Sequence, residues 1–201
     1  MSDITFPTLS LSAPAEVEWG LRANTQVLTS PLNGSVQTLE LPGARWFTSF
    51  MWETLEEADA ALLQAFLVKL RGQANRAVLF PYHRPTPRGT IAGTVLANGA
   101  IAQGATTWTL DGLTGGTTVK AGDYLACGGN LVMAVADATA SGGGAISVTV
   151  EPPTRTAIAD NAAVTYTNPT SRFILQEPDV RWNTRSPVLT NVSLAFVEAF
   201  S

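Results

Sequence analysis

Alternating apolar and polar positions predict strands in the first quarter of the chain. Val17, Trp19 and Leu21 alternate in EVEWGLR, and residues 45–52 (RWFTSFMW) carry apolar side chains at both parities. A strand with apolar side chains on both faces is usually buried on one face and partly covered on the other. The stretch SVQTLELPG also alternates, and its Pro42–Gly43 favours a turn. We therefore predict a β-hairpin that pairs SVQTLE with the aromatic strand.

A helix is predicted directly after the aromatic strand. Thr54 and Glu57 fit the capping box S/T-x-x-E, which satisfies free backbone N–H groups at a helix start. Acidic residues follow at the start, Lys69 and Arg71 lie near the end, and Gly72 can adopt a left-handed stop. The expected apolar stripe contains Leu55, Leu62, Phe66 and Leu70, with Ala58 and Ala65 beside it. We expect this stripe to pack on the aromatic hairpin.

The composition changes after the strand NRAVLFPYH and the proline-rich exit RPTPRGT. Residues 88–170 hold 13 of the 17 glycines, none of the eight phenylalanines and one of the five tryptophans. Short alternating runs fill this segment, among them TTWTLDG, GDYLACGGNLVMAVAD, AISVTVEP and AAVTYTNP. CGGN is a tight-hairpin signal and SGGGA a looser one. This pattern is typical of a small barrel or sandwich of short strands.

The aromatic-rich composition returns at the end of the chain. SRFILQE alternates, and LTNVSLAFVEAF places Val192, Leu194, Phe196 and Phe200 on one face. We predict that these strands pair with the N-terminal unit. The expected organisation is a discontinuous domain, residues 1–86 plus 170–201, with an inserted Gly-rich all-β module over residues 87–169. The predicted fold class is therefore mainly β: a β-sandwich with one flanking helix and an inserted small β-barrel or sandwich.

Composition and charge narrow the classes of function. Charged residues make up 14% of the chain and the net charge is −4, which disfavours tight binding to a nucleic-acid backbone. The single cysteine allows no intramolecular disulfide. The N-terminus lacks the pattern of a signal peptide, and no apolar run approaches a membrane span. We expect a soluble protein made in the cytoplasm, without membrane contact.

The candidate chemical residues form no convincing catalytic set. His83 is the only histidine and lies in a proline-flanked loop, so we interpret it as a hydrogen-bonding or interface residue rather than a base. Cys127 is interpreted as a small core residue. A calcium site or a glycosidase pair would have to come from carboxylates that no spacing singles out: Asp111, Asp123, Asp137, Glu151 and Asp160. We therefore predict no enzyme activity, no catalytic, cofactor-binding or metal residues, and no cofactor.

The order of these elements resembles a known family. A hairpin, a helix, a strand, an inserted β module and a closing strand follow each other as in distal tail proteins of long-tailed bacteriophages. The phrases SPLNGSVQTLELPGARWFTSFMWETL and LQAFLVKLRGQANRAVLFPYHRPTPRGT are similar to phage minor tail proteins, and so are KAGDYLACGGNL and VEPPTRTAIADNAAV in the Gly-rich segment. The order of the motifs carries the resemblance, which covers most of the chain.

The resemblance implies a structural role in a virion. Distal tail proteins form a ring, usually a hexamer, between the tail tube and the tip, and sheets of neighbouring subunits join into a wall around the passing DNA. The expected partners are further copies of the chain, the tail tube protein, tip or hub proteins and the tape measure protein. The expected location is the virion tail tip, after assembly in the host cytoplasm.

Two other classes of function stay open at this point. One is a carbohydrate- or receptor-binding accessory module, which exposure of Trp108 or Tyr124 would favour through sugar stacking and burial would disfavour. The other is a hydrolase, for which no residue pair stands out.

Overall fold

A computed structural model describes residues 1–9, 13–185 and 189–200 of the chain. The larger of its two lobes, the sheet lobe, is built on a seven-stranded sheet in the order β1-β6-β14-β16-β5-β2, with β15 paired to β16. Its strands are β1 (Asp3–Thr5), β2 (Glu16–Arg22), β5 (Arg45–Leu55), β6 (Arg76–Leu79), β14 (Ser171–Leu175), β15 (Trp182–Arg185) and β16 (Leu189–Glu198). The predicted mainly β fold with one helix is confirmed, and the sheets curl into half-barrels.

The closing strand β16 lies in the middle of this sheet. It pairs with β5 along most of its length and with β14 near its end. Its inward side chains Val192, Leu194 and Phe196 are buried, whereas Phe200, which was expected on the same face, follows the strand and is 38% exposed. The two ends of the chain therefore build one sheet, with residues 93–151 supplying the strands of another.

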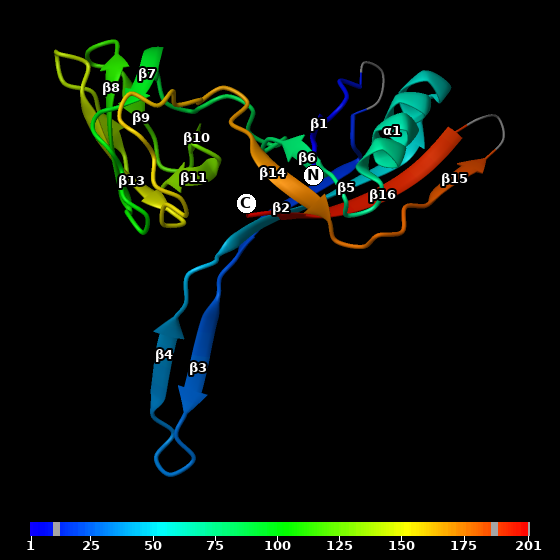
Figure 1. Cartoon of the computed structure of the whole chain (residues 1–201), viewed down its shortest axis with the longest axis horizontal. Helices are drawn as coiled ribbons and strands as arrows, with labels where there is room; N and C mark the ends of the chain where they lie inside the picture. The colour runs from blue at the N-terminus through cyan, green and yellow to red at the C-terminus, as the bar shows by residue number, and fades with distance from the viewer. Residues whose placement is uncertain (10–12, 186–188, 201) are drawn as a thin grey trace.

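The predicted hairpin partner of the aromatic strand was wrong. The stretch SVQTLE forms β4 (Val36–Glu40), which pairs with β3 (Thr25–Thr29), while β5 pairs with β2 and β16. The Pro42–Gly43 turn signal marks a break between β4 and β5, where Asn24 donates its side-chain N–H to the Pro42 carbonyl at 3.0 Å. Residues 16–55 thus form one long hairpin with a bend, and its distal half extends away from both lobes (Figure 1).

The helix α1 (Glu57–Leu70) exists, but its start and its buried face differ from the prediction. Thr54 is an exposed residue of β5, the N-cap is Glu56, and no side-chain capping bond forms, so the predicted capping box is wrong. Leu62, Ala58 and Ala65 are exposed. The face that packs on the sheet contains Asp59, Ala60, Leu63, Phe66, Leu67 and Leu70.

The end of the helix follows the sequence signal more closely. Arg71 and Gly72 both have positive φ, at 50° and 65°, so the left-handed stop begins one residue before the predicted glycine. The side chains of Leu63, Phe66 and Leu70 lie in the same buried cluster as Phe50 and Trp52 of β5. The helix therefore covers one face of the sheet, as expected (Figure 1).

The inserted lobe contains two small sheets. One has the order β10-β11-β13-β8-β7 and the other pairs β12 with β9. The bounds are β7 (Gly93–Ala97), β8 (Thr107–Leu113), β9 (Thr118–Val119), β10 (Tyr124–Cys127), β11 (Asn130–Ala134), β12 (Ala138–Thr139) and β13 (Ile146–Glu151). Gly128 and Gly129 both have positive φ and join β10 to β11, as the CGGN signal predicted. The run AAVTYTNP forms only isolated bridges rather than a strand.

The two lobes share a buried boundary. Most apolar side chains of the inserted lobe form their own core around Trp108, Leu125 and Val148. However, Tyr124 and Leu131 belong to the core of the sheet lobe. The side chain of Trp46 donates its Nε1–H to the Leu131 carbonyl across this boundary at 2.8 Å. Independent folding of residues 87–169 stays a prediction, and removing them would uncover this apolar surface.

Candidate assembly interface

The candidate chemical residues of the sequence do not converge on one site, and several of them have structural partners. The His83 ring lies 5.8 Å from the Tyr124 ring and 6.1 Å from the Trp19 ring, at the boundary between the lobes. Burial and the nearby Arg84 lower the pKa of His83, which favours the neutral imidazole. Cys127 is buried and burial raises the pKa of its thiol, so it behaves as a core residue, as predicted.

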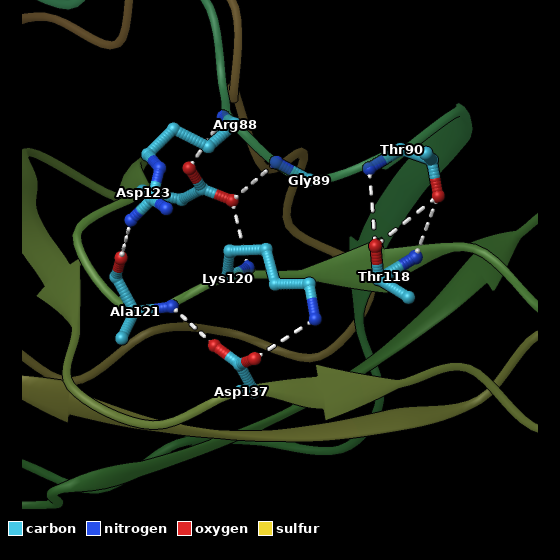
Figure 2. Close-up of polar contacts among 8 residues, drawn as sticks. All are labelled: Arg88, Gly89, Thr90, Thr118, Lys120, Ala121, Asp123 and Asp137. Carbon is cyan, nitrogen blue, oxygen red and sulfur yellow. Dashed lines mark hydrogen bonds and ion pairs between the residues drawn. The ribbon is translucent and has the colours of Figure 1, made fainter.

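Two carboxylates of the inserted lobe, Asp123 and Asp137, stabilise the turn at Lys120 and Ala121. Asp123 is fully buried and accepts the backbone N–H groups of Arg88, Gly89 and Lys120 at 2.6, 3.0 and 2.8 Å (Figure 2). Exposed Asp137 accepts a hydrogen bond from the Lys120 side chain at 2.8 Å and another from the Ala121 backbone N–H at 2.9 Å, and these two bonds lower the pKa of Asp137. These hydrogen bonds hold Arg88 and Gly89, where the chain enters the inserted lobe, against the turn between β9 and β10.

The remaining acidic residues do not form a ligand set with these two. Asp160 accepts the Gly99 backbone N–H at 2.8 Å, and burial raises the pKa of Glu151 with Glu40 adding repulsion. In the described ranges no group of three or more histidine, cysteine, aspartate or glutamate side chains could hold a metal ion. Across the same ranges, no helix has the length and apolar character needed to cross a membrane.

The two aromatic residues named for sugar stacking are buried. Trp108 is 0% exposed and donates its Nε1–H to the Thr154 hydroxyl at 2.8 Å. Tyr124 is 3% exposed, and burial raises its pKa to about 12. Neither ring presents a face to a ligand, which disfavours the carbohydrate-binding hypothesis in the form that depends on them.

A buried ion pair joins the lobes. Glu198 is 1% exposed at the end of β16, and its carboxylate lies 2.6 Å from the Arg155 guanidinium. The carboxylate also accepts the Trp46 backbone N–H at 3.0 Å and the Ser171 hydroxyl at 2.7 Å. Burial raises the pKa of Glu198, while Arg155 and these hydrogen bonds oppose the shift.

The loop that carries Arg155 is itself held in place. Buried Asn130 accepts the backbone N–H groups of Arg155 and Thr156 at 2.8 and 3.1 Å. Arg155 also donates its Nε–H to the Ala44 carbonyl at 3.1 Å and lies 4.7 Å from the centroid of the Phe200 ring. We call the Arg155–Glu198 ion pair, together with the Arg155 bond to the Ala44 carbonyl, the clasp. The clasp connects the inserted lobe both to β16 and to the base of the long hairpin.

The distal half of the long hairpin exposes five large apolar side chains. We call β3, β4 and the loop between them the arm. Apart from half-buried Ser30, every residue from Leu21 to Glu40 is exposed. Its exposed apolar side chains, with their exposed fractions, are Val27 61%, Leu28 60%, Leu32 96%, Val36 59% and Leu39 51%. Isolated two-stranded ribbons are marginal in water, so this geometry favours an arm that is stabilised by a partner.

The arm has apolar residues on both faces. In the β3–β4 register Gln26 pairs with Leu39 and Val27 with Thr38. Leu28 and Leu39 therefore share one face, and Val27 and Val36 share the other. Both outer edges of the ribbon are unpaired among the described strands. An unpaired edge with apolar residues either aggregates or pairs with another chain.

The arm carries a single charged residue, Glu40 at the end of β4. No charged residue occurs from Ala23 to Leu39, in a chain that has 28 charged residues. Charge on an exposed strand is the usual means of preventing association, so its absence favours a contact surface. The sequence interpretation missed the arm because it assigned β4 to the core hairpin; the uncharged stretch was the signal that could have identified it.

The loop at the tip of the arm is ordered by its own hydrogen bonds. Ser30 and Ser35 are linked through a backbone bond of 2.8 Å, and Gly34 donates its N–H to the Ser30 carbonyl at 3.0 Å. Gly34 has φ of +68°, which this turn requires. Leu32 projects from this loop and is the most exposed large apolar residue described.

A groove lies at the opposite end of the arm. It has a volume of about 640 Å³ and lies between the arm's base and the inserted lobe. Its apolar walls include Leu41, Pro42, Pro152, Pro153 and Phe200. That volume is within the range of protein ligand sites.

No protein-family model and no curated protein matches the chain.

Proposed function

We propose that this protein is a structural ring subunit at the distal end of a bacteriophage tail tube. In this role six copies close into a ring that joins the tube to the tip or baseplate and forms part of the DNA conduit. The proposed partners are further copies of the chain, the tail tube protein, tip or hub proteins and the tape measure protein. DNA passes through as cargo, and the ring performs no enzymatic turnover. Assembly in the host cytoplasm and residence in the virion tail tip follow from this role.

The observation that carries the proposal is the arm. A ribbon with apolar residues on both faces, and with Glu40 as its single charged residue, gains stability when each face lies against another chain. Two faces of different composition favour two different neighbours, as in a head-to-tail assembly. Such contacts close into a ring when the rotation between subunits permits it. The resemblance to distal tail proteins in the order of elements supports a ring at the tail tip.

The sheet lobe and the clasp fit the same role. In a ring, each subunit must keep its arm in a fixed orientation relative to its two lobes while neighbouring copies contact the arm. The Arg155 bond to the Ala44 carbonyl and the ion pair to Glu198 connect the arm's base to both lobes. These contacts anchor the base of the arm at Ala44, next to a Glu198 side chain that is 1% exposed.

Acidic substitutions on one face of the arm test the proposal. The double variant Leu28→Asp/Leu39→Asp should fold normally, because both residues are exposed in the single chain. Burying each leucine contributes about 1.5–3 kcal/mol, so each substitution should weaken assembly roughly tenfold or more. Sedimentation and native mass spectrometry over a concentration series would measure the loss of oligomer, and incorporation into particles would be scored alongside.

The matched control is Leu62→Asp/Val68→Asp on the outer face of α1, where both residues are similarly exposed. It should assemble as the unmodified chain does. Equal assembly of the arm variant and the unmodified chain would contradict the proposal.

A further inference from the structure

The arm's tip and the groove at its base have matching properties. The tip loop, residues 29–35, is uncharged and presents Leu32 at 96% exposure. The groove is lined by apolar side chains, and its two charged lining residues are Glu40 and Arg155. Arg155 is already neutralised by Glu198 at 2.6 Å. An uncharged apolar insert therefore leaves Arg155 with its partner, and Glu40, the other charged lining residue, is exposed to water.

A chain cannot place its own tip in its own groove. The groove wall contains Leu41–Ala44, directly after β4, and the tip lies beyond β4 at the other end of the ribbon. The ladder between them has five residue pairs, which span roughly 17 Å at the rise of a strand. The two strands of the ribbon pair antiparallel along its whole length, so the tip does not fold back toward the groove of the same chain. An arm tip that fills the groove must therefore belong to a second copy of the chain.

We propose that the groove receives the arm's tip of the neighbouring copy, with Leu32 as the inserted side chain. The proposal rests on the ring function above and specifies its subunit contact. Each copy then donates one tip and accepts another, which is a heterologous contact that can close on itself. Leu32 packs against the prolines and Phe200, and the polar groups of the tip loop lie toward the rim at Gln103.

The occupied groove also explains the position of the clasp. Arg155 is part of the groove wall and holds the Ala44 carbonyl, Glu198 and the Phe200 ring together. A tip seated there contacts both lobes of its neighbour at once. The contact would therefore fix the neighbour's lobe boundary as well as its arm.

Disulfide trapping between two single variants tests the contact. Leu32→Cys places a thiol on the tip, and Gln103→Cys places one on the exposed rim of the groove. Equal amounts of the two proteins are mixed over a concentration series with oxidised glutathione, and the products are separated without reductant. The mixed dimer should exceed both homodimers. Buried Cys127 does not contribute, because it is only 3% exposed.

The control pairs Gln103→Cys with Leu62→Cys on α1, which should give no product above random collision. The double variant Leu32→Cys/Gln103→Cys should give a ladder that ends in one closed species. Equal coupling of Leu32→Cys to the α1 variant, dominant tip-to-tip dimers, or no mixed dimer at any concentration would overturn the proposal.

The outcomes also separate this contact from the ring function. A ladder that never closes, with no ring in particles, would support the tip contact and contradict the ring. A ring in particles whose tip and groove cysteines do not couple would support the ring and contradict the tip contact.

Discussion

Replacing Phe196 by alanine is expected to destabilise the protein by roughly 3–5 kcal/mol. The side chain is 0% exposed in the central strand β16, and its ring lies 6.3 Å from that of Phe50. Its backbone position pairs with both Thr48 of β5 and Leu175 of β14. The truncation therefore leaves a cavity where the two ends of the chain meet. Urea unfolding, followed by fluorescence and circular dichroism, measures the change in the free energy of unfolding.

Val68→Ala on the exposed face of α1 is the control, since its side chain is 66% exposed. It should change stability by less than about 1 kcal/mol. A Phe196→Ala loss as small as that of the control would mean that β16 is peripheral to the core.

Replacing Glu198 by alanine is expected to cost about 3–5 kcal/mol, because it leaves the Arg155 guanidinium without its buried partner. The side chains of the pair are 1% and 14% exposed, so water compensates little. The Trp46 N–H and the Ser171 hydroxyl lose an acceptor in the same variant. Chemical unfolding gives the energy, and limited proteolysis at the lobe boundary should become faster.

Asp3→Ala is the matched control, because Asp3 pairs with Arg172 at 2.8 Å while both side chains are about 40% exposed. An exposed pair of this kind contributes about 0–1 kcal/mol. If both substitutions had equally small effects, the Glu198 pair would not hold the lobes together.

The sequence predicted those features that local chemistry determines. Phe196 was assigned to the core because period-two alternation puts its face inward in any register that buries the strand. The CGGN turn was found because Gly128 and Gly129 can both take positive φ, which a tight hairpin requires. No sheet combines strands from residues 93–151 with strands from the rest of the described chain, while the division into two domains at the prolines stays a prediction.

Features set by distant contacts could not be predicted in this way. Pairing of β5 with β2 and β16 extends the strand to Leu55, which pairs with Thr190, so Thr54 is held in the strand and cannot cap the helix. The helix then starts later and buries a face that includes Leu63 and Leu67 rather than Leu62. Local propensity gave way to tertiary pairing at both positions.

The candidate interface was missed for a related reason. Leu39 alternates with polar neighbours as a core strand would, and the pattern does not reveal that no second layer covers it. The local sequence around Glu198 is that of an ordinary polar strand end. It does not reveal the ion pair, because the partner Arg155 is 43 residues away in the other lobe. Absence of charge over residues 23–39 is the feature that distinguishes the arm from an ordinary solvated strand.

The central claim is that copies of this chain form a ring around the tube axis. Electron cryo-microscopy of assembled tails, with the protein located by a label on the exposed face of α1, tests it most directly. The account predicts a closed ring of six copies between the tube and the tip, with each arm lying against a neighbour. Single copies, or copies found only on fibres away from the tube axis, would contradict it.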